Sequence, residues 1–522
     1  MNQRTGLRML AAAILPLALA GFLPAAPAHA DSGPVARTDR GAVRGLSAGG
    51  VDSFLGIPYA AAPVGSLRWA PPRPAARWAG VRDATAFGNR CPALASTNGP
   101  RSDTEDCLFV NVQRPTGVRA GARLPVYVFF HGGGLTNGIS NQMNMDKIVR
   151  ESGVIGVTLN YRLGVFGFLG HPALTAERGE SGDYGFQDQQ AALRWVARNI
   201  AAFGGSPRRV TIGGESAGGW SVCAHLAAPG SRGLFSGAMI QSGSCATQTQ
   251  AQAEAAGTTF AASVGCAGAA AAACLRAVPA AALLDAGASF QSRIVRGTPT
   301  LPLDPHEAVR TGRFARVPVV NGSNLDEGRT FTQGLIGAGR DQYTALVRGT
   351  FGTAADAVLA QYPWPADADR FTAAYLAGAI FTDSGLLTGI GGCGTRALSA
   401  ELARWTRTYT YEFAHRTGPG LTPIPGYVWG AGHAAELAYL WPSFDNGTPI
   451  APLFTPAERL LARQMVQYWG GFVRHGRAAW PAYHPGGPIL SLRAGNRSTL
   501  IGDATWAAEH RCAFWATVPL PG

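Results

Sequence analysis

The sequence predicts an α/β fold in which helices cover one largely parallel sheet. Two observations predict it. Apolar, strand-forming runs alternate with helical segments from residue 124 onward, and a glycine-flanked serine motif stands between one of these runs and a helix. Strands are expected at 124–130, 154–160, 209–212, 234–241, 317–321 and 408–413. All of them fit the same sheet.

Helices are expected between these strands. An amphipathic pattern over 187–199 predicts one, and the alanine-rich stretch 250–288 indicates surface helices inserted after a core strand. Because neither a repeat nor a linker interrupts the chain, one domain is expected over 31–522. Hydrophobic residues make up 46% of the 522 residues and charged residues 15%, a globular composition that excludes a disordered chain.

The first thirty residues have the organisation of a secretory signal peptide. Arg4 and Arg8 precede an apolar stretch over 9–23, and Ala-His-Ala at 28–30 offers small residues for cleavage. An uncleaved anchor is disfavoured because prolines interrupt this run, and no cysteine near the cleavage point could carry a lipid. We therefore expect a secreted, soluble protein that starts near Asp31 and has no stable membrane anchor.

Charge and cysteine content exclude several classes of partner. Loss of Arg4 and Arg8 lowers the formal net charge from +12 to +10, and no basic run with interleaved aromatic residues follows, so no nucleic-acid partner is expected. Eight cysteines in an exported chain favour disulfides. No CxxC pair occurs and the histidines do not cluster with cysteines, so no metal is expected. The oligomeric state stays open.

Two stretches match Gly-x-Ser-x-Gly, and one of them has the context of a nucleophile. After Ser47 the chain continues into a glycine turn, so Ser47 is expected to be a loop residue. Ser216 follows the strand at 209–212 and opens a helical run over 220–228, which is the arrangement that exposes a nucleophile on a sharp turn. The Ala217 amide would then lie at a helix N-terminus, where it can bind an oxyanion.

A glycine-rich loop supplies candidates for further oxyanion donors. His131-Gly132-Gly133-Gly134 directly follows the strand at 124–130, as the oxyanion loop of lipases and esterases does. We therefore expect the amides of Gly133 and Gly134 to donate to the oxyanion, the alternative being a loop made only for turning. His131 is expected to be structural, because the base follows the acid in the chain order of such folds.

These residues resemble the type B carboxylesterase family, which also contains cholinesterases, bile-salt lipases and para-nitrobenzyl esterases. The resemblance covers nearly the whole mature chain. It rests on the segments 54–60, 105–112, 160–162, 203–205, 214–219, 241–244, 326–328 and 432–433. One departure is Asp183, where the family usually has asparagine. The resemblance implies an α/β-hydrolase fold and hydrolysis of small carboxylic esters through an acyl-enzyme, without a cofactor.

The residues alone leave the catalytic acid open between Asp326 and Glu327, because both follow the strand at 317–321. The resemblance implies Glu327, the glutamate before the glycine, with Ser242 as the serine beside it. Asp326 would then be a loop or capping residue.

A base is expected on a loop beyond the last core strand. His415, which ends the strand at 408–413, is the second choice and is expected to be a satisfied strand-end histidine. His433 lies on a glycine-hinged turn and matches the family motif. The resemblance therefore implies a triad of Ser216, Glu327 and His433.

The resemblance also bears on the disulfides and on the substrate. It implies the pairs Cys91–Cys107 and Cys266–Cys274, and Cys393–Cys512 is expected to close a long loop around the His433 segment. Cys223 and Cys245 remain as an expected fourth pair. Cholinesterases carry a tryptophan between the first two of these cysteines, and here 92–106 contains no aromatic residue. We therefore expect choline esters to be poor substrates and uncharged esters with short or medium acyl chains to be good ones, unless Trp69, Trp429 or Trp441 enters the site.

Two other functions compete with this prediction. A lipase or sterol esterase would need a large apolar mouth. A binding protein on the same fold, as in adhesion members of the family, would lack the serine, whereas all three triad positions are filled here.

Overall fold

The computed structural model describes residues 33–386 and 389–520. The expected signal peptide, 1–30, lies outside the described residues. The main sheet has eleven strands in the order β16-β15-β14-β13-β10-β9-β7-β8-β6-β4-β3. They are β3 (Leu46–Ala48), β4 (Val51–Pro58), β6 (Phe109–Pro115), β7 (Leu124–Phe130), β8 (Ile155–Leu159), β9 (Gly205–Glu215), β10 (Gly237–Gln241), β13 (Val319–Asn324), β14 (Thr408–Phe413), β15 (Pro488–Leu492) and β16 (Thr499–Gly502).

The centre of this sheet is parallel. Each neighbouring pair from β8 to β15 runs in the same direction, whereas β3, β4, β6 and β16 join the edges in antiparallel pairs. The predicted α/β class with a mostly parallel sheet is therefore confirmed, and the expected strands all belong to this one sheet. Two small sheets accompany it, made of β1 (Val35–Arg37), β2 (Ala42–Arg44) and β5 (Val81–Asp83), and of β11 (Gln248–Thr249) and β12 (Val295–Arg296).

Both faces of the sheet are covered because side chains alternate along each strand. In β7, Val126, Val128 and Phe130 join one buried cluster, and Tyr127 and Phe129 join another on the opposite face. The first cluster includes side chains of α4 (Tyr184–Asn199), α5 (Ala217–Ala227), α9 (Pro305–Arg310) and α13 (Gly392–Ala403). The second includes side chains of α1 (Asp146–Ser152), α14 (Leu437–Leu440) and α15 (Pro456–His475).

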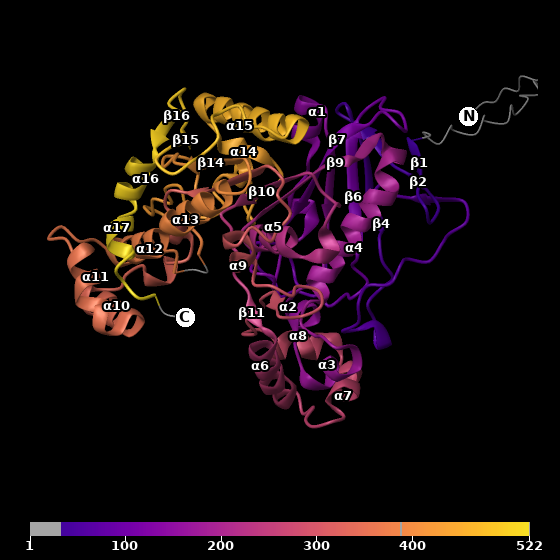
Figure 1. The fold of residues 1–522 in the computed structure, drawn as a ribbon, viewed down its shortest axis with the longest axis horizontal. Helices are drawn as coiled ribbons and strands as arrows, with labels where there is room; N and C mark the ends of the chain where they lie inside the picture. The colour runs from indigo at the N-terminus through magenta and orange to yellow at the C-terminus, as the bar shows by residue number, and fades with distance from the viewer. Residues whose placement is uncertain (1–32, 387–388, 521–522) are drawn as a thin grey trace, which may run out of the picture.

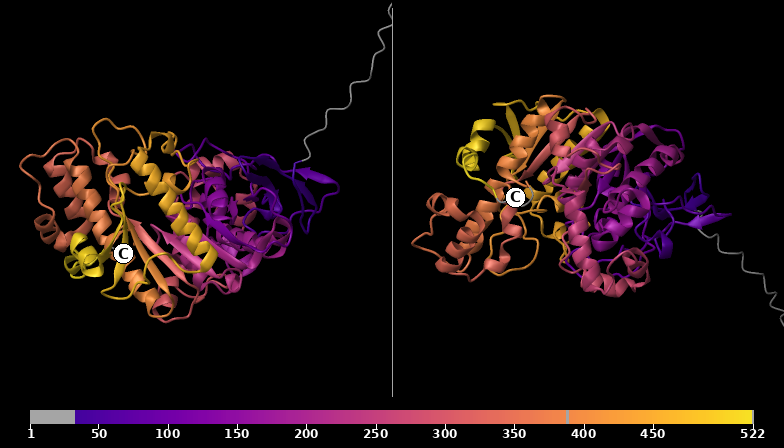
Figure 2. Two further views of the ribbon diagram at one scale, coloured as in Figure 1. Left: turned by 90° about the horizontal axis from the view of Figure 1, so that it is seen from above. Right: turned by 60° about the horizontal axis from the view of Figure 1, so that its bottom comes forward.

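The remaining helices lie around this core (Figure 1). They are α2 (Gly164–Phe168), α3 (Pro172–Arg178), α6 (Gln250–Ser263), α7 (Ala271–Ala277), α8 (Ala280–Ala286), α10 (Arg340–Phe351), α11 (Ala355–Gln361), α12 (Thr372–Ser384), α16 (Asp503–Glu509) and α17 (Cys512–Trp515). The expected insertion at 250–288 forms α6 to α8, which gather at the bottom of Figure 1. In both views of Figure 2 the indigo-to-magenta and orange-to-yellow halves of the chain lie side by side along the sheet.

Disulfides fasten several of the loops. The structure joins Cys91–Cys107, Cys223–Cys245, Cys266–Cys274 and Cys393–Cys512. Within the described ranges, no helix is both long and apolar enough to cross a bilayer.

The expectation for Ser47 is wrong in one respect. Ser47 lies in β3 and not in a loop, because residues 46–48 pair with β4 in a hairpin around the glycine turn. Its hydroxyl donates to Asp52 Oδ1 at 2.6 Å, an acceptor five residues along the same hairpin.

Candidate active site

Ser216 stands on a strained turn between β9 and α5. Its backbone has φ 56° and ψ −124°, values that an L-residue adopts only when its surroundings hold it there. Only glycine fits at positions 214 and 218, which flank Ser216, because a side chain would clash with the backbone. A Cβ at Gly214 would lie 2.4 Å from the Gly218 carbonyl carbon, and a Cβ at Gly218 would lie 2.1 Å from Phe130 O. The Ser216 amide donates to Gln241 O at 2.9 Å, which anchors the turn to the neighbouring strand β10.

Glu327 and His433 meet beside this turn. Glu327 begins a 3₁₀ turn after β13, separated from that strand by Leu325 and Asp326, and its Oε2 lies 2.6 Å from His433 Nδ1. The other carboxylate oxygen, Oε1, accepts from the Asn324 amide at 2.7 Å, and the His433 amide donates to Glu327 O at 3.2 Å. Backbone and side-chain contacts together therefore fix the orientation of the imidazole.

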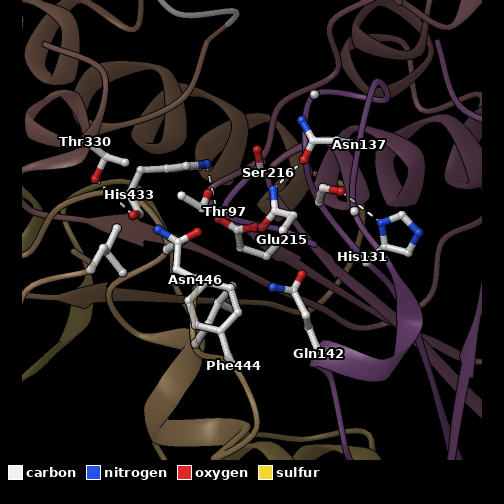
Figure 3. A pocket seen from close by; sticks show the side chains of 18 of the residues that line it. Thr97, His131, Asn137, Gln142, Glu215, Ser216, Thr330, His433, Phe444 and Asn446 are labelled. Atoms are coloured by element: carbon white, nitrogen blue, oxygen red, sulfur yellow. Dashed lines mark hydrogen bonds and ion pairs between the residues drawn. The ribbon is translucent and has the colours of Figure 1, made fainter. Parts of the chain in front are cut away.

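The Nε2 atom of His433 faces the Ser216 turn, and its nearest charged partner there is Glu215. The distance from Nε2 to Glu215 Oε1 is 3.1 Å, and Figure 3 shows Glu215, Ser216 and His433 gathered at one point of the cavity. In the described part of the chain the Ser216 hydroxyl makes no hydrogen bond with His433. Such bonds often tighten only when substrate is present, so the arrangement remains compatible with proton transfer between the two side chains.

Three backbone amides near Ser216 are available as donors. Within the described residues the N–H groups of Gly133, Gly134 and Ala217 donate to no protein acceptor. Gly132 lies against Ser216, since a Cβ there would be 3.1 Å from Ser216 Cβ. The loop at 132–134 and the N-terminus of α5 therefore present unengaged donors beside the same serine.

Ser216 and His433 open into a cavity of about 560 Å³. Its wall is contributed by both halves of the chain, with His131, Asn137 and Gln142 on one side of Figure 3 and Thr330, His433 and Phe444 on the other. The apolar lining residues include Met143, Trp220, Phe331, Ile390, Leu421, Trp429, Leu437 and Phe444. Neutral polar side chains complete it, namely Thr97, Asn98, Thr136, Asn137, Gln142, Thr330, Gln333, Thr422 and Asn446. No group of three or more His, Cys, Asp or Glu side chains in the described ranges could hold a metal ion.

Comparison with known proteins identifies the family. The family model described as "Carboxylesterase family" matches residues 32–486, which is most of the chain. The chain belongs to the carboxylesterase family. The predicted resemblance is therefore confirmed, and the chain is a serine carboxylesterase with the α/β-hydrolase fold.

Relatives of this carboxylesterase cover nearly its whole length. It is 35% identical over 503 residues to fumonisin B1 esterase of Sphingopyxis macrogoltabida, covering 90% of this chain and 88% of the relative. It is 34% identical to acylcarnitine hydrolase of Mus musculus, covering 94% and 92%. Solved structures of a PNB esterase and of a thermophilic PNB esterase align with TM-scores of 0.75 and 0.77 at 31% and 30% identity, each covering 91% of this chain and 99% of the other.

Buried carboxylates surround the imidazole of the carboxylesterase. Burial raises the pKa of Glu215 and that of Glu436, which lies three residues after His433. Burial alone would lower the pKa of His433, but the charges of Glu215 and Glu327 outweigh it and raise that pKa to about 9. The protonated imidazole is therefore stabilised for as long as these carboxylates are ionised.

A hydrogen-bonded chain behind the site orients Glu436. Asn324 Nδ2 donates to Glu436 Oε2 and to Gly432 O, each at 2.7 Å, and the Trp469 ring N–H donates at 3.0 Å to Gln241 Oε1. Gln241 Nε2 in turn donates to Glu436 Oε1 at 3.4 Å. Sequence reasoning missed Glu215, Glu436 and Asn324. The signal that could have found the first two is an acidic residue beside each motif, directly before Ser216 and three residues after His433.

The structure also places the residues that sequence reasoning set aside. Asp326 is at the N-cap position of the 3₁₀ turn, but its carboxylate pairs with Arg416 instead of capping the turn. His415 is buried and satisfied at the end of β14, with Nε2 3.0 Å from Glu458 Oε1. His131 Nδ1 lies 2.9 Å from Gly132 O, and burial lowers the pKa of its imidazole to about 4.

For Ser242, the expected place beside Glu327 remains a prediction. Its amide donates to Gly322 O at 2.8 Å, and its buried hydroxyl makes no hydrogen bond to any described residue.

Proposed function

We propose that this chain is a secreted carboxylesterase that hydrolyses uncharged esters with short or medium acyl chains, through an acyl-enzyme on Ser216. The observation that carries the proposal is the convergence of three features on one cavity. These are a serine on a strained turn, an imidazole held by a glutamate, and unengaged amides beside the serine. Each part of an acyl-transfer site has a candidate that lines this cavity or contacts a residue lining it.

In the proposed first step, His433 Nε2 takes the proton of Ser216 Oγ while Oγ attacks the ester carbonyl carbon. The carbonyl oxygen becomes negative and is bound by the amides of Gly133, Gly134 and Ala217. Glu327 keeps the imidazole oriented and stabilises its positive charge. His433 then gives the proton to the leaving alcohol, which leaves the acyl group on Ser216.

In the second step a water molecule takes the place of the alcohol. His433 accepts its proton, the hydroxide attacks the acyl carbon, and the same amides bind the second oxyanion. Collapse of that intermediate releases the acid and returns the proton to Ser216. Because each oxyanion donor is typically worth about 3 kcal/mol of barrier, the amides matter nearly as much as the triad in both steps.

The cavity wall supports an uncharged substrate. A volume of about 560 Å³ falls in the range of about 300–1,000 Å³ that is common for small-ligand sites. Apart from the reacting centre with Glu215, the side chains that line it are apolar or neutral polar. Such a wall can desolvate an acyl chain and an alkyl or aryl alcohol without leaving a buried charge unpaired.

Secretion is supported by two features of different kinds. The first thirty residues have signal-peptide organisation, and four disulfides join the described cysteines. Disulfides persist in oxidising compartments, which exported proteins reach.

A lipase is the second candidate, and the apolar residues Phe331, Trp429 and Phe444 in the cavity wall favour it. A chain-length series of p-nitrophenyl esters, from acetate to palmitate, separates the two functions when it is measured beside an emulsified triglyceride. We expect kcat/KM to peak at short or medium chains and the emulsion to be hydrolysed slowly. A steady rise to the longest chain, with rapid hydrolysis of the emulsion, would contradict the proposed substrate class.

A further inference from the structure

We propose that Asn98 is a positioning residue for the reaction. It holds Asn137, and Asn137 fixes the peptide between Gly133 and Gly134. The inference rests on the proposed role of the Gly134 amide as an oxyanion donor. Asn98 belongs to the loop closed by the Cys91–Cys107 disulfide, so this loop would act on catalysis through a hydrogen bond and not through contact with the reacting atoms.

The Gly133 carbonyl is held on the side away from the oxyanion. It accepts from the amides of Thr136 and Asn137 at 3.1 and 3.0 Å and from the Thr136 hydroxyl at 3.2 Å. In a trans peptide the C=O of one residue and the N–H of the next point in opposite directions. Fixing the Gly133 carbonyl toward Thr136 and Asn137 therefore directs the Gly134 N–H away from them.

The loop at 132–134 is tightly enclosed on two sides. A Cβ at Gly133 would lie 2.4 Å from Asn137 O and 2.7 Å from Asn137 Oδ1, so Asn137 packs directly on this glycine. On the other side, a Cβ at Gly132 would lie 2.7 Å from Glu215 Oε2 and 3.1 Å from Ser216 Cβ. A shift of Asn137 would therefore change the position of the oxyanion donors relative to the nucleophile.

Asn98 fastens Asn137 from outside this loop. Its Nδ2 donates to Asn137 Oδ1, and both side chains line the same cavity as Ser216. Figure 3 labels Asn137 in the wall of this cavity. Asn98 itself sits in a tight turn, because the amides and carbonyls of Ser96 and Gly99 exchange two hydrogen bonds of 3.0 Å.

Arg90 provides a second connection between the same two loops. This buried side chain donates from Nε to Gly138 O at 3.4 Å and from its guanidinium to Pro100 O. The disulfide loop is thereby joined to both Asn137 and Gly138, at the end of the oxyanion loop. A shift of the disulfide loop would therefore move the oxyanion donors through these direct contacts.

The test is a double-mutant cycle on Asn98→Ala and Asn137→Ala, with p-nitrophenyl acetate as substrate. We expect each single variant to lower kcat by about fivefold to tenfold, the equivalent of one neutral hydrogen bond, with KM unchanged within about twofold. The double variant should lose no more than the worse single one, because both remove the same contact. A trifluoromethyl ketone, whose hemiketal oxyanion uses the same donors, should bind more weakly by the same factor.

The matched control is Asn89→Ala, which removes an exposed amide hydrogen bond to Asp106 O in the same region without touching the oxyanion loop. Its kcat should equal that of the wild type. Labelling by diethyl p-nitrophenyl phosphate separates this inference from the proposed function, because failure to label Ser216 in the wild type overturns the latter. With Ser216 labelled, effects that add in the double variant, that appear in KM alone, or that match the control overturn the role of Asn98. Asn137→Ala carries the test if Asn98→Ala does not fold.

Discussion

Asp326 and Glu327 are neighbours in sequence, yet their carboxylates have different partners. Glu327 contacts His433, whereas Asp326 accepts two hydrogen bonds of 2.8 Å from Arg416 and one of 3.0 Å from the Ala431 amide. Asp326 precedes the 3₁₀ turn and Glu327 is its first residue, so the two side chains point to different partners. Asp326 therefore belongs to the support of the His433 loop, and Glu327 is the residue that touches the imidazole.

This difference predicts opposite phenotypes for two conservative substitutions. Glu327→Gln should lower kcat by about 10³-fold to 10⁴-fold with little change in stability, because the amide no longer stabilises the imidazolium. Asp326→Asn should leave most of kcat and lower the free energy of unfolding by about 1 to 2 kcal/mol, because the ion pair between the buried Asp326 carboxylate and the half-exposed Arg416 side chain is lost. Steady-state kinetics and denaturant unfolding measure both. If Asp326→Asn had the larger kinetic effect, the acid would be wrongly assigned.

The pH dependence should follow the charge of Glu215. His433 can accept a proton only when it is neutral, and the neighbouring carboxylates raise its pKa, so kcat/KM should rise with pH through that pKa. Glu215→Gln removes one of these charges, lowers the pKa of His433 and should move the acidic limb of the profile to lower pH. Asp326→Asn removes a buried charge elsewhere and should leave the limb in place. An unchanged or higher limb in Glu215→Gln would show that Glu215 does not act on His433.

Sequence reasoning went furthest for residues inside short motifs. The contexts of Ser216, Glu327 and His433 were all visible in the chain, because each follows an expected strand or lies on a glycine-hinged turn. The contacts of Glu215 with His433 and of Asn98 with Asn137 were not visible. Each of these contacts joins residues more than thirty positions apart in the sequence. They come together only because the loops that carry them pack against one another in the folded chain.

Among the elements, apolar strands were predicted best. The strands expected at 124–130 and 408–413 coincide with β7, which is apolar and aromatic, and with β14, in which threonines alternate with tyrosines before Glu412 and Phe413; aromatic and β-branched residues suit a buried strand. β9 extends from Gly205 to Glu215, well beyond 209–212, because pairing with β7 and β10 continues through glycines and polar residues that have low strand propensity. The ends of β9 are therefore set by hydrogen bonds to the neighbouring strands, which the local sequence pattern cannot predict.

The disulfides close loops of very different length, and this predicts unequal contributions to stability. Cys393–Cys512 spans 119 residues and Cys266–Cys274 spans 8. Chain entropy alone predicts losses of about 5 and about 2.5 kcal/mol in the free energy of unfolding when each pair is replaced by alanine. Denaturant unfolding of the two double variants measures this difference. Equal losses would contradict the loop-entropy account.

At the scale of the whole molecule, charge and cavity lining act together on substrate choice. The expected mature chain carries a formal charge of +10, which repels a cationic substrate at long range and less so in salt. Trp69 and Trp441 are buried in the hydrophobic core, whereas Trp429 and Trp220 line the cavity. The disulfide loop contributes only the neutral Thr97 and Asn98 to that lining.

The positive net charge and the absence of an aromatic residue from the disulfide loop predict that butyrylcholine is a poorer substrate than its uncharged isostere, 3,3-dimethylbutyl butyrate, unless Trp429 in the cavity wall turns its ring face to the cation. A missing desolvated cation-π contact costs about 2 kcal/mol, or roughly thirtyfold in affinity. The ratio of the two kcat/KM values, measured at low and at high salt, tests this expectation. A ratio that favours the cation would indicate that Trp429 or Trp220 supplies the contact.

Covalent labelling of the serine tests the central claim most directly. Diethyl p-nitrophenyl phosphate should release one equivalent of p-nitrophenol per chain, and peptide mass mapping should locate the diethylphosphoryl group on Ser216. Ser216→Ala should remain folded, lose both labelling and turnover, and differ in this from Ser47→Ala, which changes the other Gly-x-Ser-x-Gly serine. A label on any other residue, or more than a trace of activity in Ser216→Ala, would contradict the assignment of Ser216 as the nucleophile.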